Sequence, residues 1–226
     1  MTCKGIIFDM DGTLLDSMGY WNRIGEFFLA YHKLPKDPDF TKKVSQMNVG
    51  QLREYINKRY GFHYDKESFY REYHEIMEPV YLTMVQPKPY VREFLKYLKE
   101  KGVKTCIATA TRHSTAEMAL RHLGLMDDVE FMISCSDVGA GKNRPDVYLK
   151  SCEMLGLSVS DAVVFEDVPM CVETAKKAGF KVVGVFDEYA PEGDNALLEK
   201  ISDRYIVGYD ELLPYAKAEK AVSCAV

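Results

Sequence analysis

Residues 5–17 read GIIFDMDGTLLDS. Three apolar residues run directly into Asp9, and a second carboxylate, Asp11, follows before Gly12 and Thr13. A short apolar run that stops at a glycine turn predicts a buried strand with a tight loop after it. Acids at the end of a strand can cap a loop, bind a metal or attack a substrate. The remainder of the sequence must decide which of these roles applies.

The composition is typical of a soluble globular protein, with 226 residues, 47% hydrophobic and 28% charged. A net charge of −5 gives no support for a nucleic-acid footprint, which would need a basic face. No apolar run approaches the roughly 20 residues that span a bilayer, and residues 1–12 lack the apolar core of a signal peptide. We therefore expect a cytoplasmic protein without nucleic-acid or membrane partners, as a monomer or weak dimer.

The six cysteines are scattered, and none forms a C-x-x-C pair. Zinc sites need paired spacings, and disulfide frameworks belong to short secreted chains. We expect reduced and mostly buried thiols, with Cys224 in an exposed tail.

From residue 101 onward, short apolar stretches alternate with helical patterns. Strands are predicted at residues 103–109, 129–134, 161–167 and 181–186, with an edge strand near 203–207. Helices are predicted at 113–124, capped by Ser114 and Glu117, at 144–156, with Pro145 in the first turn, at 168–179 and, at the end, 209–220. Strands that are apolar throughout and alternate with helices indicate a parallel sheet covered on both faces. The fold class is thus α/β, with a three-layer Rossmann-like core.

Residues 18–83 show no convincing strand pattern. Helical spacing covers 20–33, 49–61 and 65–82. We predict a small helical cap at residues 17–83, inserted after the first strand of an α/β core made of residues 1–16 and 84–226. The return linker begins at Met84 and is stiffened by Pro87 and Pro89.

Polar side chains follow the predicted strands at their carboxyl ends, where ligands bind in an open parallel sheet. In chain order these are Asp9, Asp11, Thr109, Lys142, Glu166 and Asp167. Such a set at topologically equivalent places predicts one polar site rather than scattered surface charges.

This set of groups suits a phosphoryl substrate. Crowded carboxylates repel one another, and a divalent cation relieves that repulsion. Because the candidate ligands are oxygens without nearby His or Cys, we expect Mg²⁺. One carboxylate can attack phosphorus to form an aspartyl-phosphate, while a second moves the proton to the leaving oxygen and from water. Lys142 and Thr109 can supply charge and a donor to the phosphate oxygens.

Four stretches resemble the motifs of the haloacid dehalogenase-like (HAD) hydrolase superfamily, over nearly the whole chain. They are DMDGTLLDS, TCIATAT, GKNRPDVY and VVFEDVPMCVETAKKAG. The third is slightly irregular. The helical insertion resembles the small cap of β-phosphoglucomutase-like members. The resemblance implies a Mg²⁺-dependent phosphatase acting on a small phosphorylated metabolite.

The resemblance also implies residue roles. Asp9 is expected to be the nucleophile and a Mg²⁺ ligand, and Asp11 the general acid/base with its backbone carbonyl on the metal. Asp167 is expected to bind Mg²⁺, and Glu166 either assists it or hydrogen-bonds around the ligands. The residues expected to bind the phosphoryl group are Thr109, Ala110 and Lys142.

Differences from the motifs of particular family members reduce the number of activities that we expect. Dehalogenases and phosphonatases lack the second acid, so Asp11 argues against both. The sugar-phosphate mutases carry a histidine where this chain has Trp21, which disfavours a β-phosphoglucomutase-type activity without removing it as the alternative. A non-catalytic phospho-ligand-binding protein is a further alternative, which the complete set of acids disfavours. The cap is expected to close over the site and select the substrate, through Met18, Tyr20, Trp21 and Asn48.

Overall fold

The computed structural model describes residues 3–44 and 47–214. The chain divides into two compact units, one of residues 1–16 with 86–226 and one of residues 17–85. The sequence predicts the return boundary two residues earlier, after Thr83. None of the helices in the described ranges is long and apolar enough to cross a membrane.

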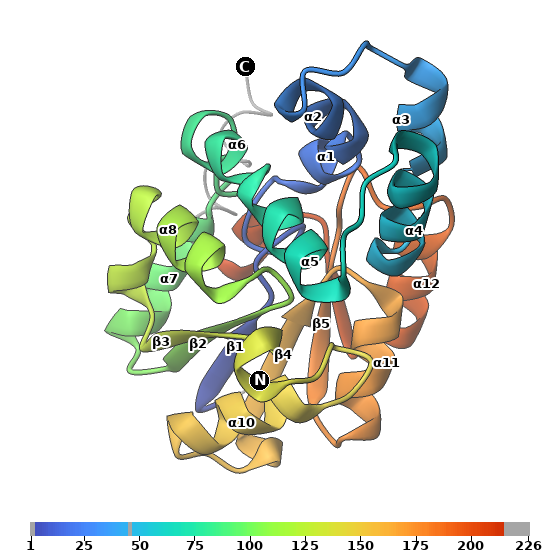
Figure 1. Ribbon diagram of the computed structural model, residues 1–226. Coiled ribbons are helices and arrows are strands. Elements are labelled where there is room, and N and C mark those ends of the chain that lie inside the picture. The colour runs from blue at the N-terminus through green and yellow to red at the C-terminus, as the bar shows by residue number, and fades with distance from the viewer. Residues whose placement is uncertain (1–2, 45–46, 215–226) are drawn as a thin grey trace. The chain divides into compact units, whose positions relative to one another are not determined.

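The first unit is built on a six-stranded sheet with the order β3-β2-β1-β4-β5-β6, and every pairing in it is parallel (Figure 1). Its strands are β1 (Gly5–Phe8), β2 (Lys104–Thr109), β3 (Phe131–Ser134), β4 (Ala162–Glu166), β5 (Lys181–Val185) and β6 (Arg204–Ile206). The first strand lies at the centre, between β2 and β4. The chain order reverses there, so the loops after β1, β2 and β4 meet beside one another.

Helices cover both faces of this sheet (Figure 1). They are α7 (Val91–Glu100), α8 (His113–His122), α9 (Cys135–Val138), α10 (Asp146–Leu155), α11 (Pro169–Lys177) and α12 (Asp194–Ile201). Three 3-10 turns, Met126–Asp128, Val159–Asp161 and Tyr209–Leu212, complete the unit. The expected three-layer α/β/α architecture is confirmed.

Alternate residues of each strand build the two cores, because successive side chains point to opposite faces. On one face, Ile7 and Val164 are buried with residues of α10, α11 and α12. On the other, Phe8 lies edge-on to Phe94 of α7, with ring centroids 6.2 Å apart, and 4.9 Å from the ring of Phe165. Both strands are therefore buried on both sides, as their unbroken apolar runs predicted.

Several details of the α/β unit differ from the sequence-based expectation. Helix α8 begins at His113 with Arg112 as its N-cap and no side-chain cap, so Ser114 lies inside the helix and the predicted capping box is wrong. Pro145 is the N-cap of α10 rather than part of its first turn. The return linker that begins at Met84 ends at Tyr90, since α7 starts at Val91.

At the end of the chain, the expected helix begins as the 3-10 turn Tyr209–Leu212, and its continuation over 215–220 lies outside the described residues. The unbonded thiols expected from the sequence are confirmed for four buried cysteines: Cys106, Cys135, Cys152 and Cys171. Cys3 is half-buried, and Cys224 lies outside the described residues.

The second unit is helical, and its described residues contain no strand. It comprises α1 (Met18–Trp21), α2 (Ile24–Tyr31), α3 (Pro38–Val44), α4 (Val49–Tyr60), α5 (Lys66–Glu75) and α6 (Glu78–Thr83). Aromatic rings supply much of its core, as in the 6.2 Å contact between the rings of Phe28 and Phe40. Bulky side chains are what a unit of this size needs to bury sufficient apolar area.

Candidate active site

The first candidate residue, Asp9, directly follows β1. Its backbone N–H donates to the carbonyl of Phe165 in β4 over 2.9 Å, and its side chain is buried. The chain then turns sharply, because Leu15 and Leu14 both donate to the carbonyl of Met10 and Gly12 has a φ of 83°. A positive φ is easily reached only by glycine, so the turn depends on that residue.

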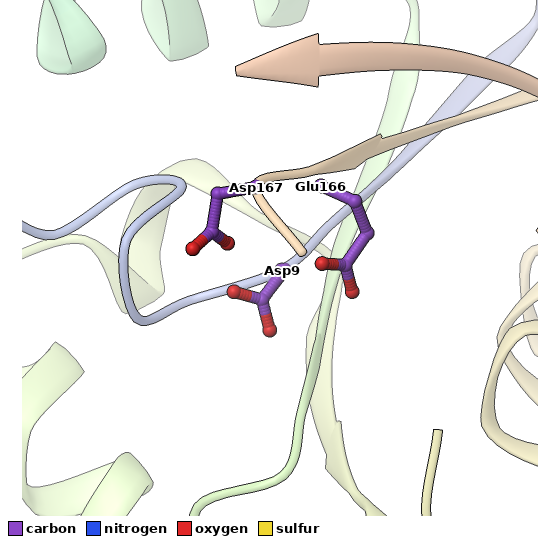
Figure 2. Close-up of side chains that lie close together, drawn as sticks. All are labelled: Asp9, Glu166 and Asp167. Carbon is purple, nitrogen blue, oxygen red and sulfur yellow. The ribbon is translucent and has the colours of Figure 1, made fainter. Parts of the chain in front are cut away.

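Three buried carboxylates gather at the ends of β1 and β4. One oxygen from each of Asp9, Glu166 and Asp167 lies within 4.8 Å of the others. Figure 2 shows Asp9 and Asp167 on loops that leave neighbouring strands, with all three side chains directed toward a common region. Two strands that are far apart in sequence thus bring their terminal acids together.

Lys142 connects two members of this cluster. Its Nζ donates to Oδ1 of Asp9 and, over 2.6 Å, to Oε1 of Glu166, and its side chain is almost fully buried. The hydroxyl of Tyr148 donates to the same Oε1 over 2.7 Å. Glu166 therefore holds Lys142 in place, which supports the hydrogen-bonding role left open for it by the sequence.

Asp167 is held from the first loop. The Thr13 hydroxyl donates to its Oδ1 over 2.8 Å, and the Thr13 carbonyl accepts the hydroxyl of Tyr209 over 3.2 Å. Thr13 thereby links the turn after β1 to the acid after β4, and the second oxygen of Asp167 is not used in this bond.

Burial raises the pKa of two of these carboxyl groups, Asp9 and Asp167. Burial raises the pKa of Asp9 to about 6, although the adjacent Lys142 opposes the shift. Burial, and then the charge of Asp9, raise the pKa of Asp167 well above its usual range. Burial alone would lower the pKa of Lys142, but Asp9 and Glu166 hold it above the ordinary value.

The charges and atoms present fit a magnesium ion. When ionised, the three carboxylates outnumber the single ammonium group, and a divalent cation would neutralise the excess negative charge of this buried cluster. The donor atoms are carboxylate oxygens, which Mg²⁺ prefers. Since Oε1 of Glu166 already accepts two hydrogen bonds, Asp9 and Asp167 are the residues best suited to hold the ion.

The second acid, Asp11, lies on the other side of the turn and meets the loop after β2. Thr111 donates its hydroxyl to Oδ2 of Asp11 over 2.7 Å. Thr109, at the end of β2, accepts the N–H of Thr111 over 3.0 Å, so its own hydroxyl hydrogen can point elsewhere. Ala110 follows with an exposed side chain.

The substrate contacts expected from the cap all lie in the helical unit. Asn48 caps α4, accepting the N–H of Gln51 over 3.0 Å. Trp21 donates its Nε1 to the Tyr81 hydroxyl over 3.1 Å and stacks on Tyr73 at 5.1 Å. Tyr20 donates to the carbonyl of Met84 over 3.3 Å, and Met18 begins α1. These contacts account for their local packing, and their part in substrate choice stays a prediction.

Two groups of the site are not among the candidates that the sequence patterns predict. Tyr148 lies within the predicted helix at 144–156, and Thr111 is the last residue of the TAT stretch. The available signal was position. Tyr148 lies in the first turn of the helix that follows Lys142, and Thr111 lies two residues after the strand-end hydroxyl of Thr109.

The family model described as haloacid dehalogenase-like hydrolase matches residues 3–179 of this sequence. The chain belongs to that family. The match includes every strand-end residue of the cluster, and it confirms the resemblance drawn from the four motifs.

Similar proteins include enzymes that act on sugar phosphates. A phosphorylated carbohydrates phosphatase of Thermotoga maritima is 30% identical, over 87% of this chain and 90% of its own length. The beta-phosphoglucomutase of Bacillus subtilis is 26% identical, over 88% of this chain and 91% of its own length. Three further relatives, 25% to 28% identical, are also phosphatases. The expected enzyme class, a phosphoric monoester hydrolase, is supported by these relatives.

Among solved structures, CbbY of Rhodobacter sphaeroides in complex with phosphate has a TM-score of 0.73 at 21% identity, over 93% of this chain and 96% of that one. This likeness establishes the fold.

Proposed function

We propose that this protein is a Mg²⁺-dependent phosphatase that hydrolyses a phosphorylated sugar or a similarly small metabolite through an aspartyl-phosphate. The observation that carries the proposal is the buried Asp9 carboxylate, held by Lys142 and faced by Asp167. The names of the phosphatase relatives support the substrate class.

In the first step, a carboxylate oxygen of Asp9 attacks phosphorus as the bond from phosphorus to the leaving oxygen breaks. The proton of Asp11 passes to that oxygen, so an alcohol departs rather than an alkoxide. Lys142 and Thr109 bind the phosphoryl oxygens as charge moves among them. The product of this step is a phosphoryl group bound to Asp9.

In the second step, water attacks phosphorus and gives its proton to the Asp11 carboxylate. The bond between phosphorus and the Asp9 oxygen breaks, which releases inorganic phosphate and restores both acids. Mg²⁺, held by Asp9 and Asp167, would screen the repulsion between the nucleophile and the anionic substrate.

A mutase is the second candidate, because one relative is a beta-phosphoglucomutase. Trp21 in place of the expected histidine disfavours it, and the Trp21 indole is already hydrogen-bonded to Tyr81 within the helical unit. Incubation with a hexose 1-phosphate and a sugar bisphosphate separates the two activities. A phosphatase yields free phosphate, whereas a mutase yields the hexose 6-phosphate.

The deciding experiment is phosphate release from several dozen phosphorylated metabolites with Mg²⁺, for the wild type and Asp9→Asn. We expect Asp9→Asn to be inactive while folded, and intact mass spectrometry to detect a phosphorylated wild-type enzyme only. Asp127→Asn, an exposed aspartate on the turn before β3, is the matched control and should retain full activity. Near-wild-type turnover by Asp9→Asn would contradict the proposal.

A further inference from the structure

Thr111 touches the proposed proton-transfer residue directly. Its hydroxyl donates to Oδ2 of Asp11 over 2.7 Å, although the two residues are 100 positions apart in the chain. Thr111 is 4% exposed, so little water competes for this bond. The reaction proposed above assigns the hydroxyl no role.

The backbone of Thr111 is fixed on both sides of its α-carbon. Its N–H donates to Oγ1 of Thr109 over 3.0 Å, and its carbonyl accepts the hydroxyl of Ser134 over 2.7 Å. Thr109 and Ser134 are the paired last residues of β2 and β3. The sheet therefore sets the position of Thr111, and a β-branched side chain has few χ1 rotamers from which to choose.

We infer that Thr111 is a positioning residue for Asp11: its hydroxyl holds Oδ2 and so orients the carboxyl group that delivers the proton to the leaving oxygen. The inference rests on the proposed function. The terminal torsion of an aspartate side chain has broad energy wells, so the carboxyl group can turn unless a hydrogen bond restrains it. The Thr111 hydroxyl thus fixes the carboxyl plane from which the proton is transferred.

The proton balance of the step is simple. The O–H bond of the Asp11 carboxyl group breaks, and the proton goes to the leaving oxygen, which keeps the electron pair of its broken bond to phosphorus. Asp11 becomes a carboxylate and still accepts the Thr111 hydroxyl, now with a full negative charge on the acceptor. The same bond is therefore present before and after proton transfer, and it strengthens as the acid ionises.

Substrates whose leaving groups differ in pKa can distinguish a role of Thr111 in positioning Asp11 from a purely structural role. A good leaving group needs little protonation, whereas a poor one depends on it. We would measure kcat/KM for aryl phosphates from 4-nitrophenyl to 4-methylphenyl phosphate with Mg²⁺, because kcat/KM reports the steps up to cleavage of the ester bond. The variants are Thr111→Val, which removes the hydroxyl at nearly constant shape, and Thr111→Ser, which keeps it.

We expect Thr111→Val to lose about tenfold or more on 4-methylphenyl phosphate and much less on 4-nitrophenyl phosphate. Its plot of log kcat/KM against leaving-group pKa should be steeper than that of the wild type, and Thr111→Ser should restore the shallow slope. Thr105→Val, at a buried threonine near the start of β2, the strand that leads to Thr111, is the control and should leave the slope unchanged.

A double-variant cycle supplies the second readout. In an Asp11→Asn background, Thr111→Val should change the slope no further, because the group that it positions is gone. An equal loss on every aryl phosphate, or additive effects in the cycle, would overturn the inference. If Thr111→Val does not fold, Thr111→Ala against Thr111→Ser gives the same comparison.

The two proposals fail in different ways. If Asp9→Asn is inactive but the Thr111→Val slope equals that of the wild type, only the role of Thr111 is rejected. If Asp9→Asn keeps wild-type rates, the proposed function is rejected, and the role of Thr111 with it.

Discussion

The hydroxyl of Tyr148 donates to Oε1 of Glu166 over 2.7 Å. Lys142 donates to the same oxygen over 2.6 Å, so a single carboxylate oxygen connects the first turn of α10 to the ammonium group beside Asp9. All of these side chains are buried, and a buried charged acceptor depends on each of its donors.

Removal of that hydroxyl should weaken the placement of Lys142. We expect Tyr148→Phe to lower the free energy of unfolding by about 1 to 3 kcal/mol, because a buried carboxylate loses a donor. It should also raise KM for an aryl phosphate more than it lowers kcat, since Lys142 is the proposed ligand of the phosphoryl group. Urea denaturation and steady-state kinetics measure the two effects.

The matched control is Tyr205→Phe. The hydroxyl of Tyr205, at a partly buried position on β6, donates to Oδ1 of Asn195 over 3.3 Å. It should leave KM unchanged. Equal KM values for the wild type and Tyr148→Phe would show that Lys142 is placed without help from Tyr148.

Magnesium should stabilise the folded protein through Asp9 and Asp167. A ligand at 100 times its Kd stabilises by about 2.7 kcal/mol, which is measurable as a rise in Tm over the protein in EDTA. Asp167→Asn should abolish this rise, because it removes a charged ligand. Asp127→Asn should keep it, and a full rise in Asp167→Asn would show that the ion binds elsewhere.

The same stabilisation should depend on pH. Burial raises the pKa of Asp9 to about 6, and protons compete with the ion below that value. The rise in Tm should thus be larger at pH 7.5 than at pH 5. Without the metal, in EDTA, the pH dependence of stability is the opposite. Because the pKa of Asp9 is higher in the folded than in the unfolded protein, the free energy of unfolding should fall as the pH rises from about 4 to 6. A free energy of unfolding in EDTA that increases between about pH 4 and 6 would contradict the raised pKa of Asp9.

The buried ion pair between Lys88 and Asp187 should matter for stability. Lys88 donates to Asp187 over 2.9 Å and to the carbonyl of Phe186 over 2.7 Å, and its own N–H donates to the carbonyl of Leu14. Asp187 is 1% exposed, so Lys88→Ala leaves a buried charge without its partner, which costs about 3 kcal/mol or more.

Denaturation of single and double variants measures this coupling. Lys88→Ala with Asp187→Ala together should destabilise by less than the sum of the single changes. The exposed pair of Lys150 and Glu153 serves as the control, where the coupling should stay below about 1 kcal/mol. A coupling energy below about 1 kcal/mol between Lys88 and Asp187 would show that this pair stabilises the protein no more than an exposed ion pair does.

A comparison of Gly12→Ala with Gly102→Ala distinguishes the effect of backbone strain from the effect of a distorted active site. Their φ values are 83° and 69°, so an alanine at either position costs about 1 to 2 kcal/mol. A Cβ at Gly102 would meet no atom within 4 Å, so only the strain is added there. Both variants should unfold at lower urea concentration, but only Gly12→Ala, in the turn between Asp9 and Thr13, should lose phosphatase activity. Equal activities in the two variants would contradict the role given to this turn.

The sequence alone predicted most elements of the sheet, and the reason is local. Strands such as Val163 to Phe165 are apolar on both faces, and the helices between them end at glycines such as Gly156, whose φ of 67° continues no helix. It was less reliable for helix caps. Helix α8 begins at His113, as predicted, but its N-cap is Arg112 without any side-chain bond, so the capping box predicted for Ser114 and Glu117 is wrong.

The candidate acids were also accessible from the sequence, because each one stands at the end of an apolar strand or within three residues of it. Asp9, Asp11, Glu166 and Asp167 stand at strand ends, and the carboxyl ends of parallel strands meet at one edge. The pattern therefore predicted the acidic cluster and the lysine together with it.

The tertiary structure decided which of these groups touch. Sequence spacing could not predict three of these contacts. Lys142 bridges Asp9 and Glu166. Tyr148 donates to the same Glu166 oxygen as Lys142, and Thr111 donates to Asp11. Each contact joins segments that are distant in the chain, and a hydrogen bond depends on atom positions within a few tenths of an ångström. Residue type and period determined the sheet and the acids at its edge, whereas packing of the loops beyond it determined the partner of each acid.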